Sequence, residues 1–341
     1  MSGSRTEDIN APVTARTEDP AVPGFLRRCA ETPAVRRLRD VGMNCGCEYT
    51  SFARFRGLAP YSRFDHSMGV ALIVWRFTRD PAQSVAGLLH DIATPVFAHV
   101  VDFMNGDYLT QESTEAGTEE IIRRSPELGR CLRDLGLTVA DVSDYHRYPI
   151  ADNDAPRLSA DRLEYTLGNA VRYGFCVEEQ ARHFFEDLTV GSDGEGRDEL
   201  VFRDRETAEA FAMTALRCSA VYVSDEDRYA MQILSELLRY ALDIGVLAPR
   251  DLHTTEPEVI AALQRDGRTA ARWRDFRSMA RIRRADSPGP DGEWRRVRAK
   301  KRYIDPSVTG RDRVSRLCPA YGEKLAGFLG ESQDVWLCAD R

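Results

Sequence analysis

The stretch from Tyr61 to Phe103 constrains the fold more than any other part of the chain, because helical spacing and histidines coincide there. Two sets of apolar residues repeat at i, i+3, i+4 and i+7, as one face of a helix does: Val70, Ile73, Val74 and Phe77, then Val85, Leu88, Leu89 and Ile92. They predict helices over 68–78 and 81–91, the second beginning at Pro81 directly after Asp80, an N-cap followed by proline. We expect these two helices to pack antiparallel.

Two imidazoles and a carboxylate lie where these helices would meet. His66 opens the first helix, and His90 and Asp91 lie in the last turn of the second. The antiparallel pairing therefore brings the three side chains together. Asp161, in the first turn of a helix predicted over 159–173, is the best candidate for a fourth ligand. Nitrogen and oxygen ligands together suit a divalent transition metal better than calcium, so the sequence predicts a metal site.

The rest of the chain is mostly helical by pattern. We expect a helix over 24–41, a loop or short hairpin over 43–60, and a short helix over 96–104 that places His99 and Asp102 on one face. Further helices are predicted over 114–124, 126–135, 178–185, 205–223, 227–244 and 257–264. Turn residues within 192–196 predict a small hairpin over 188–202, and "EWRRVRAKKRYI" after the loop 287–292 alternates as a strand. The predicted fold is mainly all-α, with a small β-hairpin and a minor α+β C-terminal part.

Three regions follow from this pattern. We expect residues 1–22 to form a disordered tail, 23–250 a helical core, and 251–341 a C-terminal α+β extension that packs on the core. The basic run from Arg295 to Arg302 contains six Lys or Arg residues. We interpret it as a solvated strand or a subunit contact in preference to an anion site for a regulatory nucleotide.

Composition narrows the class of protein. Hydrophobic residues make up 43% of the 341 residues, enough for a substantial core, and the net charge of -7 argues against a nucleic-acid coat. The first residues lack the apolar segment of a signal peptide, and no apolar run is long enough to span a bilayer. We therefore expect a cytoplasmic protein with no membrane partner, whose eight cysteines are mostly small core residues.

Three motifs carry a family resemblance. They are "RFDHSMGV" at 63–70, "LLHDI" at 88–92 and "ADRLEY" at 160–165. Together they resemble the HD-domain phosphohydrolase superfamily, whose signature is H…HD…D on an all-α fold, and most closely the deoxynucleoside triphosphate triphosphohydrolases. "TPAVRRLRDVG" and "KKRYIDPSV" extend the similarity from about Thr32 to Leu317. The resemblance implies an HD-domain helical core and a homo-oligomer.

The resemblance also implies residue roles. His66, His90, Asp91 and Asp161 would hold a divalent metal, which could be Mn, Fe, Ni, Mg or Zn. Arg63 matches an arginine that binds a substrate phosphate, and Tyr165 a tyrosine beside the bound nucleotide. His99 and Asp102 match polar groups that surround the site.

The chain departs from the triphosphohydrolases at their proton-transfer residues. Thr94 stands where a catalytic His is expected, and Gln111 replaces a second His in the segment that ends at Glu112. Asn169 stands where an Asp contacts the sugar hydroxyl. Hydrolysis of a smaller phosphate ester therefore fits better than release of triphosphate.

We expect a metal-dependent phosphohydrolase that acts on a nucleotide or other small phosphorylated metabolite, by attack of metal-activated water on phosphorus. Asp91 would accept a proton from that water, and His99, with Asp102 beside it, or Glu112 would protonate the leaving oxygen. Thr94 and His146 are predicted to line the substrate site. Three alternatives stay open: a dNTP triphosphohydrolase with an altered proton relay, a non-catalytic nucleotide-binding regulator, and a di-iron oxygenase that adds His99 and His146 as ligands.

Overall fold

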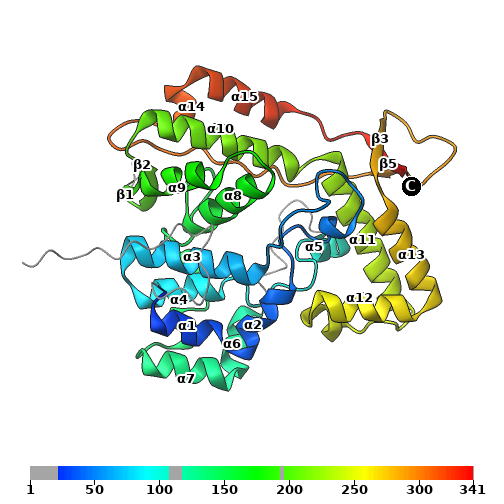
Figure 1. The fold of residues 1–341 in the computed structure, drawn as a ribbon, viewed down its shortest axis with the longest axis horizontal. Coiled ribbons are helices and arrows are strands. Elements are labelled where there is room, and N and C mark those ends of the chain that lie inside the picture. The colour runs from blue at the N-terminus through cyan, green and yellow to red at the C-terminus, as the bar shows by residue number, and fades with distance from the viewer. Residues whose placement is uncertain (1–21, 107–116, 193–195, 341) are drawn as a thin grey trace, which may run out of the picture.

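Helices α3 (Arg63–Thr78) and α4 (Pro81–Leu89) form the predicted antiparallel pair in a computed structural model that describes residues 22–106, 117–192 and 196–340. Figure 1 shows this pair at the left of the molecule, between α8 and α1. Helix α3 begins five residues earlier than predicted, because Ser62 and Asp65 form a capping box. Asp80 caps α4 as expected, its carboxylate accepting from the backbone N–H of Ala82 at 2.8 Å and of Gln83 at 3.3 Å.

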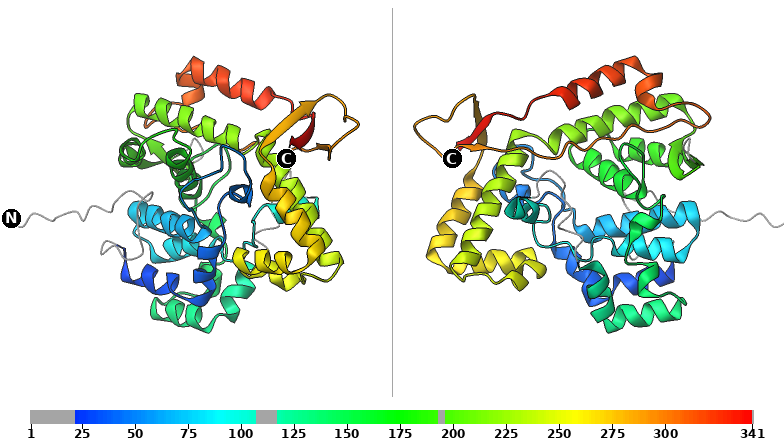
Figure 2. Two further views of the ribbon diagram at one scale, coloured as in Figure 1. Left: turned by 45° about the vertical axis from the view of Figure 1, so that its right-hand side comes forward. Right: turned by 180° about the vertical axis from the view of Figure 1, so that it is seen from behind.

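Two hydrophobic clusters build the interior. The first surrounds α3 and α4 and takes side chains from α1 (Gly24–Ala30), α2 (Pro33–Arg36), α6 (Thr118–Arg124), α7 (Pro126–Asp134), α8 (Ala160–Arg172), α9 (Glu178–Glu186), α10 (Arg205–Val221), α14 (Val314–Leu317) and α15 (Pro319–Gly330). The second is built on α5 (Val100–Asn105), α11 (Asp225–Asp243), α12 (Glu256–Arg265) and α13 (Gly267–Ser278). Figure 2 shows, from two directions, that the helices of the first cluster lie side by side with those of the second.

Two small sheets complete the fold. Strands β1 (Leu188–Ser192) and β2 (Asp198–Phe202) form the predicted hairpin, with Val190 opposite Leu200. Strands β3 (Arg281–Ala285), β5 (Trp336–Asp340) and β4 (Arg295–Arg296) form an antiparallel sheet in the order β3-β5-β4. Short 3₁₀ helices lie in the connections: η2 (Arg37–Asp40), η3 (Cys47–Tyr49), η4 (Val139–Asp141), η5 (Tyr145–Arg147) and η6 (Pro249–His253). The prediction of a mainly all-α fold with small β parts is confirmed.

Several element predictions are wrong in detail. The helix expected over 24–41 is broken into α1, α2 and η2, because Pro33 cannot continue the hydrogen-bond ladder of α1. The short helix expected from Val96 begins only at Val100, since Phe97 and Ala98 have positive φ angles. The strand expected over 293–304 is limited to the two residues of β4. By contrast, 43–60 is a loop that contains η3, one of the two structures expected there. Helices α13 and α15 and strand β5 were not predicted.

Other predictions fall on residues outside the described ranges, including most of the N-terminal tail and Gln111 and Glu112. All eight cysteines are free thiols. Within 22–106, 117–192 and 196–340, no helix combines the length and apolar character needed to cross a membrane.

The cap of α4 generates a stability prediction. Asp80→Ala should lower the free energy of unfolding by about 1 kcal/mol, because two backbone N–H groups lose their acceptor. Urea denaturation followed by circular dichroism measures this change. Asp80→Asn should retain most of the stability, and equal losses in both variants would contradict a capping role.

Candidate active site

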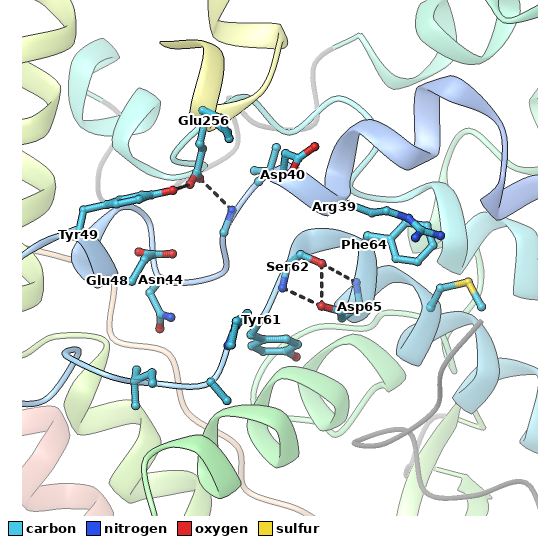
Figure 3. Close-up of a pocket in the computed structure, with 17 residues that line it drawn as sticks. Arg39, Asp40, Asn44, Glu48, Tyr49, Tyr61, Ser62, Phe64, Asp65 and Glu256 are labelled. Carbon is cyan, nitrogen blue, oxygen red and sulfur yellow. Dashed lines mark hydrogen bonds between the residues drawn. The ribbon is translucent and has the colours of Figure 1, made fainter. Parts of the chain in front are cut away.

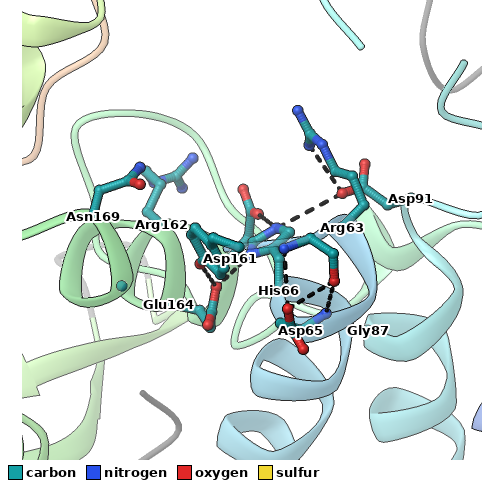
Figure 4. Close-up of polar contacts among 12 residues, drawn as sticks. Arg63, Asp65, His66, Gly87, Asp91, Asp161, Arg162, Glu164 and Asn169 are labelled. Atoms are coloured by element: carbon teal, nitrogen blue, oxygen red, sulfur yellow. Dashed lines mark hydrogen bonds and ion pairs between the residues drawn. The ribbon is translucent and has the colours of Figure 1, made fainter. Parts of the chain in front are cut away.

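The side chains predicted as metal ligands converge between α3, α4 and α8 (Figure 4). The Nε2 atoms of His66 and His90 lie 3.2 Å apart. Asp161 Oδ1 lies 3.0 Å from His66 Nε2 and 3.7 Å from His90 Nε2. Asp91 Oδ2 lies 3.9 Å and 3.5 Å from the same two nitrogens. Two imidazole nitrogens and two carboxylate oxygens therefore face one point.

Each histidine is oriented through its other ring nitrogen. His66 Nδ1 contacts Glu164 Oε2 at 2.5 Å, and His90 Nδ1 donates to the carbonyl of Gly87 at 2.7 Å. The Tyr61 hydroxyl donates to the same Glu164 oxygen at 2.5 Å. These contacts leave both Nε2 atoms free to face a ligand, which is the usual outer-shell arrangement of a histidine metal site. The sequence did not predict Glu164 or Tyr61, although Glu164 lies one helical turn after Asp161.

Two glycines make room for this support. A Cβ atom on Gly69 would lie 2.5 Å from the side chain of Glu164, and one on Gly168 would lie 2.7 Å from the Tyr61 hydroxyl. Real Cβ atoms do not approach so closely. The close approach of α3, α8 and Tyr61 therefore depends on the absence of a side chain at Gly69 and Gly168. Gly69 is the glycine of the motif "HSMG", so the sequence contained one indication of this approach.

Charge is distributed unevenly across the cluster. Burial alone would lower the pKa of His66, but hydrogen bonds with Asp161 and Glu164 outweigh burial and raise that pKa to about 10. Burial would raise the pKa of Asp91, but Arg63 outweighs it, with Nη1 3.0 Å from Asp91 Oδ2, and holds that pKa well below its usual range. Asp161 is also held ionised, because hydrogen bonding to His66 overcomes the effect of burial and lowers its pKa. Two carboxylates thus stay negative, that of Asp91 in a buried position and that of Asp161 in a partly buried one.

These features fit a divalent cation. Buried carboxylates need a positive partner, and the two Nε2 atoms point at the same place as their oxygens. In the described part of the chain, His66, His90 and Asp161 are the only group of three such residues within ligand distance of one another. That group includes neither His99 nor His146, so a single ion fits better than two irons.

The cluster opens into a cavity of about 660 Å³. Of the other predicted site residues, the ones that line it are Arg63, His99, His146, Tyr165 and Asn169. Asn169 Nδ2 donates to the Tyr222 hydroxyl at 2.9 Å. His146 Nδ1 lies 2.9 Å from Asp152 Oδ2, and Arg162 Nη1 lies 3.1 Å from the other oxygen of Asp152.

Two predicted residues lie behind this lining. The Thr94 hydroxyl donates to Asp91 Oδ1 at 2.7 Å. Asp102 is fully buried, and its Oδ2 lies 2.9 Å from His99 Nδ1, as the i, i+3 spacing predicted. Thr94 and Asp102 therefore orient Asp91 and His99, and Glu112 lies outside the described residues.

Lys300, Arg302 and Tyr303 also line the cavity, together with Lys301. The expectation that this basic run is a solvated strand is therefore wrong for its last residues. The strand β4 ends at Arg296, and the chain beyond it enters the cavity wall.

Comparisons with known proteins agree with this geometry. No protein-family model matches the chain. It is 27% identical over 317 residues to "Metal-dependent phosphohydrolase cns2" of Cordyceps militaris, covering 88% of this chain and 86% of that protein. It is 28% identical over 248 residues to "Uncharacterized protein YdhJ" of Bacillus subtilis, covering 71% and 72%.

Solved structures share the fold. A phosphohydrolase from Bacteroides thetaiotaomicron has a TM-score of 0.63 at 16% identity, covering 98% of this chain and 99% of that chain. A hypothetical protein from Aquifex aeolicus has a TM-score of 0.61 at 18% identity, covering 98% and 96%. The sequence similarity and the shared fold together support an HD-type phosphohydrolase. Its assignment to the triphosphohydrolase subgroup stays a prediction.

Polar contacts from other parts of the chain hold the loop between His90 and His99 in place. Arg37 donates to the carbonyls of Ile92 at 3.0 Å and Thr94 at 2.7 Å. Glu256 on α12 accepts from the backbone N–H of Phe97 at 3.2 Å, and Phe97 is one of the two neighbouring residues with positive φ. Buried contacts therefore hold this strained turn immediately before His99.

Glu256 also lines a second cavity, of about 680 Å³ (Figure 3). It accepts from the backbone N–H of Gly42 at 2.9 Å and from the Tyr49 hydroxyl at 2.8 Å. Burial raises its pKa, and burial raises the pKa of the neighbouring Glu48 to about 8. Asn44 lines both cavities, so the two cavities are neighbours.

The raised pKa of His66 makes metal binding sensitive to pH. Since binding must displace the His66 proton, affinity should rise roughly tenfold per pH unit between about pH 6 and about pH 8. Calorimetric titration with Mn²⁺ in buffers of different ionisation enthalpy measures the released proton. Glu164→Gln should flatten this dependence, because it removes a carboxylate that raises the pKa. An affinity independent of pH would contradict the assignment of His66.

The contacts of Glu256 predict a structural role. Glu256→Ala should lower the free energy of unfolding by about 3 kcal/mol, because two backbone N–H groups and a hydroxyl lose their buried acceptor. Urea denaturation measures the loss. Glu256→Gln keeps a carbonyl acceptor and should lose much less, so equal losses in the two variants would count against these hydrogen bonds.

Proposed function

We propose that the protein hydrolyses a nucleotide or another small phosphorylated metabolite in the cavity beside His66, His90, Asp91 and Asp161. The convergence of these four side chains on one point supports the proposal most directly. They would hold the divalent ion, which supplies Lewis acidity toward a phosphoryl oxygen and toward water. We leave the ion as Mn, Fe, Ni, Mg or Zn, because all of these accept nitrogen and oxygen ligands.

Two buried polar atoms support a polar phosphorylated substrate. Arg63 Nε and Asn169 Oδ1 have no hydrogen-bond partner among the described residues, although both side chains line the cavity and are only 7% and 5% exposed. Such groups are costly unless a ligand satisfies them. Arg63 suits a phosphate oxygen, and Asn169 Oδ1 suits a hydroxyl or amino donor elsewhere on the substrate.

Aromatic residues suit a nucleobase. Tyr165 and Tyr222 pack edge to face with ring centroids 5.9 Å apart, and Tyr145, Tyr173 and Tyr303 also line the cavity. A flat heterocycle can pack against such rings. The combination of tyrosines with arginines therefore supports a nucleotide in preference to a sugar phosphate.

His99 is the candidate for proton transfer. Burial lowers its pKa, so the neutral ring is favoured, and Asp102 fixes the ring through Nδ1. A neutral ring with Nδ1 engaged leaves Nε2 as an acceptor. We therefore propose that His99 accepts a proton, in place of the acid role expected from the sequence.

Turnover is tested with nucleoside mono-, di- and triphosphates and sugar phosphates, each with Mn²⁺, Fe²⁺, Ni²⁺, Mg²⁺ or Zn²⁺. We expect release of inorganic phosphate, and Asp161→Ala should lower kcat/KM on the order of 10³-fold because it removes a ligand of the ion. His183→Ala, a histidine of α9 that contacts Thr207, serves as the control and should retain activity. Release of triphosphate would favour the dNTP triphosphohydrolase. Nucleotide binding without turnover of any compound would favour the regulator.

A further inference from the structure

One face of helix α8 runs along the cavity of the candidate active site. Asp161, Tyr165, Asn169 and Tyr173 all line that cavity, and they recur every four residues, as one face of a helix requires. At 1.5 Å per residue, Asn169 lies about 12 Å along the helix axis from Asp161 (Figure 4). The cavity therefore has one end at the candidate metal ligands and another end beyond Asn169.

Side chains from three other segments meet α8 at this second end. The Asn169 amide donates to the Tyr222 hydroxyl at 2.9 Å, and the Tyr173 hydroxyl donates to Asn44 Oδ1 at 3.0 Å. After burial, the charge of Asp227 is the largest influence that raises the pKa of Tyr173, so Asp227 is close to that hydroxyl. We call these five cavity-lining residues, Asn44, Asn169, Tyr173, Tyr222 and Asp227, the distal end of the cavity.

Asp227 supplies the one carboxyl group of the distal end. It lies in the first turn of α11, and Met231, one turn further on, also lines the cavity. Asp227 Oδ1 accepts from the Cys47 thiol at 3.6 Å. Arg228 pairs with Asp225, and among the described residues no Lys, Arg or His forms an ion pair with Asp227. The carboxyl group can therefore bind a ligand without first breaking an ion pair.

Burial makes the neutral form of Asp227 the main form at pH 7. Burial raises its pKa to about 8, and the charge of Glu226 adds to the rise, while the hydrogen bond from Cys47 and the charge of Arg228 oppose it. A neutral carboxyl group donates one hydrogen bond and accepts another. Asp227 therefore presents a donor and an acceptor side by side to the cavity.

The other titratable groups that face Asp227 do not change charge near pH 8. Burial raises the pKa of Cys45 to about 12 and raises those of Cys47 and Tyr173 well above their usual ranges. Burial also raises the pKa of Glu48 to about 8, but Glu48 lines the second cavity. A pH effect near 8 that disappears in Asp227→Asn therefore belongs to Asp227.

The distal end also holds an acceptor without a partner. Asn169 Oδ1 is buried and makes no hydrogen bond among the described residues, and the rings of Tyr173 and Tyr222 lie on the same cavity wall. A ligand that satisfies these groups offers a flat apolar face and, at its edge, N–H donors beside an acceptor. Adenine and cytosine carry an amino group next to an unprotonated ring nitrogen, which matches the donor and acceptor of a neutral carboxyl group.

We propose that Asp227 determines the base specificity of this site by pairing with the edge of adenine or cytosine. Its hydroxyl donates to the ring nitrogen, its carbonyl oxygen accepts from the amino group, and Asn169 Oδ1 accepts the second N–H of that amino group. The inference rests on the proposed function, because it names the base of a nucleotide whose phosphate lies at the metal ligands. The two helical turns between Asp161 and Asn169 then separate phosphate from base.

Binding of nucleosides to the full-length, Mn²⁺-loaded protein tests this assignment with ligands that carry no phosphate ester. At pH 7, adenosine and cytidine should bind about tenfold more tightly than uridine and guanosine, because only they match both hydrogen bonds of the neutral carboxyl group. Asp227→Leu should weaken adenosine binding about 10- to 100-fold and remove most of the preference. Equilibrium dialysis measures the affinities.

Asp227→Asn is the matched variant, because its amide keeps one donor and one acceptor but does not ionise. In the wild type, adenosine affinity should be full below about pH 7 and fall by up to about tenfold per pH unit above about pH 8, where the carboxylate has lost its donor. Asp227→Asn should keep the preference without this fall. Asp243→Asn, at the exposed C-terminal end of α11, should behave as the wild type.

The outcomes separate this inference from the proposed function. Equal binding of all four nucleosides, or an unchanged preference in Asp227→Leu, would overturn the inference, and hydrolysis of phosphate esters in the same protein would leave the proposed function intact. A preference for adenosine over 2′-deoxyadenosine without a preference among bases would assign Asp227 to the sugar and also overturn it. Base preference in a protein that hydrolyses none of the panel would support Asp227 and refute the proposed function. If Asp227→Leu does not fold, the pH profiles of the wild type and Asp227→Asn decide, and identical profiles would overturn the inference.

Discussion

The contact between Glu164 and His66 Nδ1 is the interaction on which the candidate site depends. It selects which ring nitrogen of His66 faces His90 and Asp161, and Tyr61 fixes the carboxylate from the other side. This arrangement requires α3 and α8 to approach within a distance that only Gly69 and Gly168 permit. The position of the Glu164 carboxylate and the packing of α3 against α8 are therefore coupled, so that a change in one requires a change in the other.

A second layer of buried polar contacts joins the site to distant parts of the chain. Arg37 and Glu256 lie far apart in the sequence, yet both bind backbone groups of the loop between His90 and His99. Buried polar groups of this kind are stable only when they are fully paired. The loop can therefore keep positive φ angles at Phe97 and Ala98, and His99 is presented from a fixed turn.

The sequence predicted the parts of the site that depend on local spacing. Helical periodicity predicted that His66 lies near His90 and Asp91, and the i, i+3 spacing predicted that His99 lies beside Asp102. It did not predict Glu164 and Tyr61, whose role depends on helix–helix distance, or Arg302, whose position depends on the path of an irregular segment. The prediction of one long helix over 24–41 is wrong for a local reason. It followed the apolar periodicity across Pro33, where a helix cannot simply continue.

The cavity lies at the seam between the two hydrophobic clusters. Tyr145 belongs to the first cluster, Cys45 and Met231 belong to the second, and all three line the cavity. A ligand bound there contacts both clusters at once and stabilises only the state in which the two clusters are packed together. Ligand binding in the cavity would therefore couple the local unfolding of the two clusters. Regions that open separately in the free protein would then exchange their amide hydrogens as one unit.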